Sequence, residues 1–260
     1  MKIVIVLRVT GETSLQGTRA LVTGASRGIG RAVVLDLVRA GCDVAGAARS
    51  VDALAALGEE IEADGGRFLP VDVDIGSPEA IPAAVARAWD WQGGLDVLVN
   101  VSGVIVRTDP LDVTPAEWDQ TFDVNVRGTY FVTREVGRRM LATRGGSIVT
   151  VTSLAGERVT RASVSYQASK AALIQLTRAL AVHWAPTVRV NAVAPGYIRT
   201  DLNAALLDEP ETSAYVLGKT PLGRVGQPDD VVGAVRFLAS PSAAYVTGQN
   251  LRVDGGWSAQ

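Results

Sequence analysis

Short runs of β-branched residues alternate along this chain with longer segments that are rich in Ala, Leu and Arg and have helical spacing. This alternation is typical of βαβ units, in which helices pack on a parallel sheet. The runs are apolar almost throughout, as in strands buried on both faces. We expect strands at 19–23, 43–48, 67–71, 95–99, 147–152, 188–193 and 249–253, and helices at 29–40, 52–63, 78–90, 115–143, 164–185 and 228–239. The sequence therefore predicts an α/β fold, a single doubly wound domain with a seven-stranded parallel sheet flanked by helices.

Two segments interrupt the alternation. Residues 1–14 form an N-terminal extension whose start, Ile3 to Leu7, has strand-like character, and we expect either a disordered arm or an edge strand there. Residues 196–218 form a long connection after a strand, and such connections are often lids over a substrate. Because no repeat or low-complexity linker is present, we expect one catalytic domain over residues 15–260.

Composition excludes several classes of protein. The 260 residues are 47% hydrophobic and 20% charged, with a net charge of −2, so the chain is globular and has no basic field for nucleic acid. With one cysteine, Cys42, and one histidine, His183, the chain cannot form an internal disulfide or a His/Cys zinc cluster. No stretch of about 20 apolar residues exists to span a membrane. We expect a cytoplasmic protein without a metal site.

A glycine-rich loop, Thr23-Gly24-Ala25-Ser26-Arg27-Gly28-Ile29-Gly30, joins the first predicted strand to the first helix. A tight glycine turn lets backbone N–H groups approach a pyrophosphate, and the helix N-terminus adds partial positive charge. The spacing is GxxxGxG, which differs from the usual GxGxxG dinucleotide fingerprint. On its own the loop is weak evidence, because glycines also close strand-to-helix turns that bind nothing.

The loop resembles that of the short-chain dehydrogenase/reductase family, and the resemblance continues over about residues 15–257. The family has a Rossmann-type fold. Ser153 precedes Tyr166 by thirteen residues, Tyr166 to Lys170 matches YxxxK, and Asn125 lies in Asn-Val-Arg-Gly. The resemblance implies that the catalytic set is Asn125, Ser153, Tyr166 and Lys170. One departure is the turn Asn100-Val101-Ser102-Gly103, where the family has Asn-Asn-Ala-Gly, so an amide that could brace the turn is missing.

The resemblance also implies a set of cofactor contacts beyond the glycine loop. Asp72-Val73 resembles the adenine-binding pair, and Pro195-Gly196 with Ile198 and Thr200 resembles the loop beside the nicotinamide. The full predicted cofactor set is Gly24, Ser26, Arg27, Gly28, Ile29, Gly30, Arg49, Ser50, Asp72, Val73, Asn100, Tyr166, Lys170, Pro195, Gly196, Ile198 and Thr200.

Tyr166 and Lys170 are four residues apart on one predicted helix, so both side chains lie on one face. A free phenol has a pKa of about 10, and we expect the Lys170 ammonium to lower the pKa of Tyr166. By resemblance, Lys170 also holds the nicotinamide ribose, Ser153 binds the substrate oxygen and Asn125 helps retain a water. A serine hydrolase is a poor alternative, because no serine lies in a GxSxG elbow and His183 is the only available histidine base.

The second predicted strand ends in Ala48-Arg49-Ser50. Relatives that use NAD carry an acidic residue where Ala48 stands, whereas an arginine attracts the 2′-phosphate of NADP. Arg27 in the glycine loop adds a second positive charge. The sequence therefore favours NADP(H) over NAD(H); the alternative is that Arg49 lies in solvent and the preference is mild.

The substrate is a small carbonyl or alcohol, and several alternatives remain open. The segments 179–200, 205–210 and 220–224 resemble the gluconate dehydrogenase branch, which interconverts sugar acids and their keto forms. Arg107 could pair with a substrate carboxylate beside Ser153 and Tyr166, or could be a surface arginine beside Asp109. The alternatives are a 3-oxoacyl thioester or general ketone reductase and a dinucleotide-binding sensor without turnover. The family resemblance implies a homotetramer or homodimer formed through 115–143 and 164–185.

Overall fold

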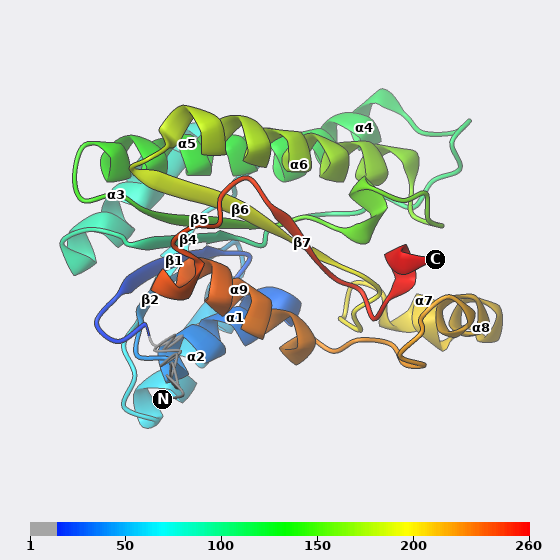
Figure 1. Ribbon diagram of the computed structural model, residues 1–260, viewed down its shortest axis with the longest axis horizontal. Coiled ribbons are helices and arrows are strands. Elements are labelled where there is room, and N and C mark those ends of the chain that lie inside the picture. The colour runs from blue at the N-terminus through cyan, green and yellow to red at the C-terminus, as the bar shows by residue number, and fades with distance from the viewer. Residues whose placement is uncertain (1–14) are drawn as a thin grey trace, which may run out of the picture.

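The computed structural model describes residues 15–260, in which seven parallel strands form one sheet of order β3-β2-β1-β4-β5-β6-β7 (Figure 1). The predicted extension 1–14 lies outside the described residues. The strands are β1 (Arg19–Thr23), β2 (Asp43–Ala48), β3 (Phe68–Asp72), β4 (Val97–Asn100), β5 (Gly146–Val151), β6 (Val188–Pro195) and β7 (Asn250–Val253). This confirms the predicted doubly wound α/β fold.

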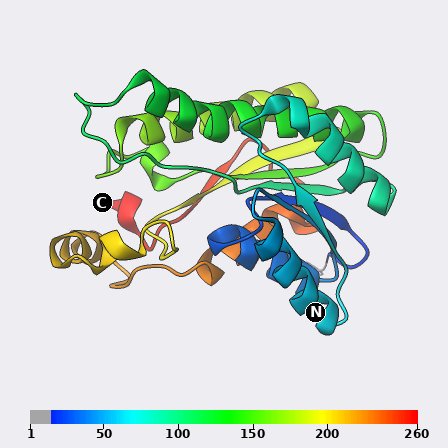
Figure 2. The same ribbon diagram turned by 180° about the vertical axis from the view of Figure 1, so that it is seen from behind.

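Helices cover both faces of the sheet (Figures 1 and 2). The helices are α1 (Gly28–Arg39), α2 (Val51–Ala63), α3 (Ile81–Gln92), α4 (Pro115–Phe122), α5 (Thr129–Leu141), α6 (Val164–Trp184), α7 (Ala204–Asp208), α8 (Pro210–Gly218) and α9 (Asp229–Ala239). One hydrophobic cluster joins the sheet to α1, α2 and α9, and another joins it to α3, α5 and α6. Strands buried between these layers need the continuous apolar runs seen in the sequence.

Most predicted elements appear within two residues of their expected bounds, but the predicted helix 115–143 is interrupted. A π-helical segment, Asp123–Gly128, separates α4 from α5. At its end, a Cβ on Gly128 would lie 2.2 Å from the carbonyl oxygen of Ile75, so the chain passes the turn after β3 too closely for any side chain there. π-helical turns are rare and often occur at functional sites. Here the interruption contains Asn125, one of the predicted catalytic residues.

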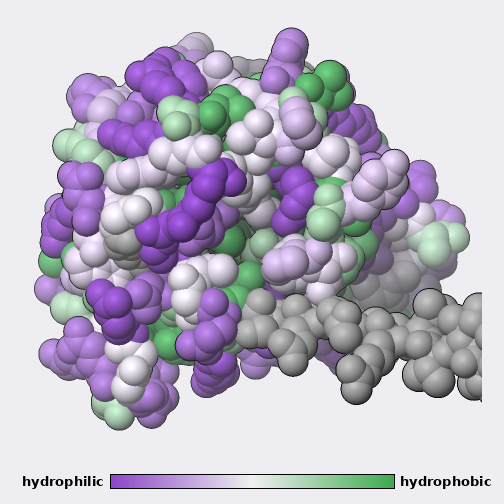
Figure 3. All heavy atoms as spheres, turned by 60° about the vertical axis from the view of Figure 1, so that its left-hand side comes forward, coloured by the Kyte–Doolittle hydropathy of each residue, from purple (hydrophilic) through white to green (hydrophobic). Residues whose placement is uncertain are grey.

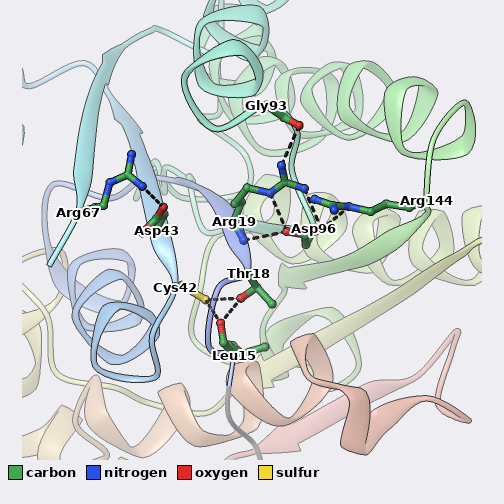
Figure 4. Close-up of polar contacts among 9 residues, drawn as sticks. All are labelled: Leu15, Thr18, Arg19, Cys42, Asp43, Arg67, Gly93, Asp96 and Arg144. Atoms are coloured by element: carbon green, nitrogen blue, oxygen red, sulfur yellow. Dashed lines mark hydrogen bonds and ion pairs between the residues drawn. The ribbon is translucent and has the colours of Figure 1, made fainter.

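Ion pairs connect neighbouring strands at the edge of the sheet where the amino ends of the strands lie. Arg19 and Arg144 both bind Asp96, with N–O distances of 3.0 and 2.9 Å, and Arg67 binds Asp43 at 2.7 Å (Figure 4). Cys42 lies beneath these pairs, and burial raises the pKa of its thiol to about 11. The surface on this side is mostly hydrophilic, with small separate hydrophobic patches (Figure 3). We see only structural contacts at this edge.

The opposite edge, at the carboxyl ends of the strands, carries the candidate site. Strand β1 lies between β2 and β4, so the order in which the chain adds strands reverses there. Loops after β1 and β4 consequently diverge and leave a crevice, which is where ligands bind in open α/β sheets. Among residues 15–260 no helix has the length and apolar character that a membrane span requires.

Candidate active site

The glycine loop crosses the carboxyl end of β1 and enters α1. The chain passes itself so closely that a Cβ on Gly30 would lie 2.0 Å from the carbonyl oxygen of Gly24. Gly24 has φ +70° and its own Cβ would lie 2.8 Å from the backbone nitrogen of Ser102. Arg27 precedes the helix without capping it through its side chain, so the first N–H groups of α1 receive no acceptor from that side chain. This is the geometry of an anion-binding helix N-terminus.

A cavity of about 580 Å³, here called the glycine-loop cavity, extends from this loop across the carboxyl edge. Most of the predicted cofactor residues line it: Gly24, Ser26, Arg27, Gly28, Ile29, Gly30, Arg49, Ser50, Val73, Tyr166, Lys170, Pro195, Gly196, Ile198 and Thr200. The side chain of Arg49 is 64% exposed and lies 3.9 Å from Asp74, a carboxylate that the sequence analysis did not single out. An exposed pair at this distance contributes little, so Arg49 is available to another anion.

Three of the predicted catalytic and cofactor-binding residues do not line this cavity. Asp72 is exposed at the end of β3, while its neighbour Val73 does line the cavity. Asn100 is buried and donates to the hydroxyls of Thr133, at 2.9 Å, and Thr150, at 3.4 Å. It therefore ties β4 to α5 and β5 beneath the site. The turn that lacks the family's second Asn is held by Thr23, whose hydroxyl accepts from the backbone nitrogens of Val101 and Ser102.

Asn125 is the third, and its side chain is fully engaged within the protein. The amide accepts from the backbone nitrogen of Val104 at 2.8 Å and donates to the Val104 carbonyl and to the hydroxyl of Ser169, both at 3.0 Å. The residue is completely buried. Its side chain thus fastens the loop after β4 to α6.

Ser153, Tyr166 and Lys170 meet at the carboxyl end of β5. Ser153 follows the strand, and Tyr166 and Lys170 lie one turn apart on α6. Tyr166 shares a side-chain hydrogen bond with Ser153. Lys170 is buried, donates to the carbonyl of Val151 at 3.0 Å and lies 5.6 Å from the centre of the Tyr166 ring. The predicted helical spacing does bring the phenol and the ammonium to one face.

The direction of the Tyr166 pKa differs from the sequence-based expectation. Burial raises the pKa of Tyr166, and the Ser153 hydrogen bond and the positive charge of Arg107 oppose this only in part. Lys170 does not supply the expected lowering, and burial reduces the pKa of its own amine to about 8. Desolvation disfavours the charged form of each group, the phenolate and the ammonium. Tyr166 is therefore a protonated phenol at neutral pH in this structure.

A second cavity of about 620 Å³, here called the lid-side cavity, adjoins the first. Ser153, Tyr166, Gly196, Leu202 and Asn203 line both cavities, so the reactive hydroxyls stand where the two meet. Arg107 lines the lid-side cavity and donates to the carbonyl of Leu202 at 3.2 Å. Within the described residues Arg107 has no ion pair with Asp109. The guanidinium is therefore available to a ligand.

The segment 196–218, predicted as a lid, contains α7 and α8 and forms part of the wall of the lid-side cavity. Its Tyr197 and Tyr215 rings pack on Trp257 near the C-terminus, with centroids 5.0 and 5.4 Å away. This aromatic cluster anchors α8 to the body of the domain. The C-terminal residues consequently shape the cavity, although nothing in their local sequence pattern indicates a site.

Sequence reasoning missed a further group of residues that line the lid-side cavity, namely Thr160, Arg161, Ser163 and Tyr197. The first three precede α6. Their position three to six residues before Tyr166 is a local signal, because the residues at the start of a helix that carries a reactive phenol lie near that phenol. A loop, however, does not reveal from its sequence which side chains turn inward.

The doubly wound sheet, with a glycine loop and a Tyr–Lys helix at its carboxyl edge, defines a Rossmann-type protein. A family model described as enoyl-(acyl carrier protein) reductase matches residues 24–258. A 2-dehydro-3-deoxy-D-gluconate 5-dehydrogenase of Pseudoalteromonas atlantica is 40% identical over 94% of this chain and 97% of its own. With these matches over nearly its full length, the chain belongs to the short-chain dehydrogenase/reductase family.

Relatives with different names are similar to this chain to nearly the same degree. A 3-oxoacyl-[acyl-carrier-protein] reductase of Synechocystis is 39% identical over 94% of this chain and 98% of its own. A crystal structure of a gluconate 5-dehydrogenase from Burkholderia cenocepacia in complex with NADP and tartrate has a TM-score of 0.92 and 33% identity, covering 95% of this chain and 98% of that one. Overall similarity therefore fixes the family and leaves the substrate to be argued from the cavity.

Proposed function

We propose that this protein is an NADP(H)-dependent oxidoreductase that interconverts a secondary alcohol and a ketone, with a sugar acid or polyol as substrate. The observation that carries this proposal is the placement of Ser153 and Tyr166 where the glycine-loop cavity meets the lid-side cavity. A dinucleotide in the first cavity and a carbonyl compound in the second would both reach these hydroxyls. A sensor without turnover would have no use for them at that junction.

The chain's own residues supply the proton chemistry. When bound, the nicotinamide supplies or accepts the hydride. Ser153 and Tyr166 hydrogen-bond the substrate oxygen, and Tyr166 donates its phenolic proton to that oxygen during reduction. The raised pKa of Tyr166 keeps the phenol protonated and suits this direction at neutral pH. Oxidation needs the phenolate, so its rate should rise as the pH is raised.

The residues of the glycine-loop cavity fit a dinucleotide phosphate. The close approach of Gly24 and Gly30 leaves backbone N–H groups at the N-terminus of α1, where a pyrophosphate is favoured. Arg49, with Arg27 on the same cavity wall, fits the extra 2′-phosphate of NADP. Related dehydrogenases solved with NADP, such as the Burkholderia cenocepacia structure, support this assignment.

The cofactor preference can be tested at Arg49. We expect Arg49→Ala to raise the Kd of NADPH about tenfold, because a partly exposed arginine–phosphate contact contributes on the order of 1–2 kcal/mol. The Kd of NADH should stay unchanged. Fluorescence titration of both cofactors measures this, and Arg31→Ala, which removes a charge on α1 outside the cavity, serves as the control. Tighter binding of NADH than NADPH by the unaltered protein would overturn the NADP assignment.

We propose that Arg107 binds the carboxylate of the substrate. It lines the lid-side cavity, has no carboxylate partner among the described residues, and lies close enough to Tyr166 to lower the pKa of the phenol. A guanidinium that is free of protein carboxylates and faces a cavity fits a ligand carboxylate in a two-pronged contact.

The variant Arg107→Ala separates this role from a structural one. We expect the KM for a keto acid to rise about tenfold or more and the KM for a neutral ketose to change less than twofold. Loss of the Arg107 contact with Leu202 alone would disturb the lid segment for both substrates. Initial rates with matched acidic and neutral ketones measure the difference, and equal effects would remove Arg107 from substrate recognition.

The proposed reaction itself is tested by NADPH oxidation with 5-keto-gluconate beside an acetoacetyl thioester. Turnover of the keto acid supports the sugar-acid assignment. Turnover of the thioester alone would favour the 3-oxoacyl reductase alternative. Two observations support that alternative: the 39% identical Synechocystis relative, and apolar residues such as Ile105 and Leu206 in the cavity lining. Binding of NADPH without turnover of any carbonyl compound would favour the sensor.

We also propose a homotetramer or homodimer formed through α4, α5 and α6. Trp118, Leu141 and Val182 on these helices are 41%, 40% and 79% exposed. Exposed large apolar side chains that gather on one surface often mark a protein–protein contact. Light scattering on a size-exclusion column gives the mass, and a monomeric mass at micromolar concentration would contradict this assembly.

A further inference from the structure

Arg161 lies in the loop between β5 and α6 and lines the lid-side cavity. Its guanidinium stacks over the ring of Tyr215 at 4.3 Å and pairs with Glu211 on α8 at 3.1 Å. The Glu211 side chain is 85% exposed, and exposed ion pairs are weak. The Tyr215 ring therefore holds the Arg161 guanidinium in place, while the Glu211 carboxylate can be replaced by the carboxylate of a ligand.

The helix α6 begins three residues after Arg161 in the chain. Ser163 occupies the N-cap position, yet its hydroxyl makes no capping bond. The Ser163 oxygen is buried and has no hydrogen-bond partner in the described part of the chain, and Ser163 and Val164 line the same cavity as Arg161. An uncapped helix of 21 residues presents free N–H groups and partial positive charge at this end. Arg161 and this helix end therefore both favour an anion in the cavity that they line.

Arg107 and Arg161 reach the lid-side cavity from two different loops, after β4 and after β5. The only acidic residue among those that line the described cavity is Asp109. A substrate with one carboxylate can neutralise one of the two guanidinium groups and leaves the other to the weak pair with Glu211. A substrate with two carboxylates satisfies both.

We propose that Arg161, with Ser163 and the first turn of α6, is a specificity-determining site that binds a second carboxylate, so that the preferred substrate is a hydroxy or keto dicarboxylic acid. This rests on the proposed function of the same cavity. The Glu211 pair shows that the Arg161 guanidinium accepts a carboxylate. A guanidinium also binds phosphate, so a phosphorylated sugar acid is the comparison that tests the dicarboxylate.

Calorimetry on the enzyme–NADPH complex tests this without turnover, because glucarate and gluconate are alcohols that the reduced cofactor cannot oxidise. The two acids differ only in a carboxylate or a hydroxymethyl group at one end. We expect glucarate to bind at least about tenfold more tightly than gluconate, as a charged hydrogen bond predicts. Arg161→Met should abolish this ratio and leave the Kd of gluconate within twofold, whereas Arg178→Met, on an exposed part of α6 outside the cavity, should preserve it.

Glu211→Gln distinguishes a binding role from a structural one. If Glu211 competes with the substrate for Arg161, this variant should bind glucarate about two- to fivefold more tightly, the opposite of Arg161→Met. If the pair only holds α8 in place, breaking it from either side should weaken binding of both acids alike, and the proposal is then wrong.

The remaining outcomes are also decisive. Equal affinity for glucarate and gluconate in the unaltered protein would overturn the second carboxylate site and leave the sugar-acid assignment intact. If 6-phosphogluconate binding depends on Arg161 more strongly than glucarate binding does, the dicarboxylate assignment is wrong. If neither acid binds while NADPH does, the sugar-acid function fails together with this inference.

Discussion

Tyr166→Phe should lower kcat for carbonyl reduction by about a thousandfold or more, because the substrate oxygen loses its proton donor. Phenylalanine keeps the ring and its packing and removes only the hydroxyl that stands between the two cavities. The affinity for NADPH should change less than threefold. Stopped-flow measurement of NADPH oxidation, with cofactor binding followed by fluorescence, separates the two effects.

Tyr245→Phe is the matched control for this experiment, because Tyr245 is fully exposed and lies in neither cavity. It should retain full activity. A Tyr166→Phe protein that keeps more than about a tenth of the activity would show that another group delivers the proton. The assignment of Tyr166 as the catalytic acid would then fall.

Lys170→Met should lower kcat strongly and at the same time stabilise the fold at neutral pH. Burial reduces the pKa of Lys170 from 10.5 to about 8, so holding this ammonium in the folded protein costs about 3 kcal/mol below pH 8. Methionine avoids that cost but forfeits the hydrogen bond to the Val151 carbonyl, worth about 1 kcal/mol. We expect a net gain of about 2 kcal/mol in the free energy of unfolding.

The pH dependence of this gain has a defined sign. Between about pH 8 and pH 10.5 the unfolded protein binds one more proton at Lys170 than the folded protein does, so the unaltered protein gains stability as the pH rises. Lys170→Met lacks that gain, and the difference between the two proteins should shrink over this window. Urea titrations at pH 7, 8 and 9.5 measure it. A variant that is less stable at pH 7 would contradict the cost assigned to the buried charge.

Such a trade of stability for activity is expected at a functional site. The buried ammonium of Lys170 lowers the free energy of unfolding, and within the described residues it donates a hydrogen bond to the carbonyl of Val151. A buried lysine beside Tyr166 is explained if a bound ligand accepts a hydrogen bond from its ammonium. This agrees with the proposed role of Lys170 toward the cofactor ribose.

The sequence by itself determined the features that depend on short-range spacing. The alternation of apolar runs and helical segments predicts the parallel sheet, since strands buried on both faces need uninterrupted apolar side chains. The glycine loop is recognisable because only glycine permits the close approach of residues 24 and 30. Tyr166 and Lys170 are four residues apart on one helix, so their common face needs no tertiary information.

Only the tertiary structure decided what depends on contacts between distant segments. The side-chain amide of Asn125 bonds to Val104 and Ser169, on the loop after β4 and on α6, which lie far from it in the sequence. The pKa of Tyr166 rises because packing partly shields the phenol from water, an effect that no local spacing reveals. Arg161 meets Glu211 fifty residues later in the chain. Such pairs are set by how loops and helices pack, and the sequence shows the residues without showing which of them meet.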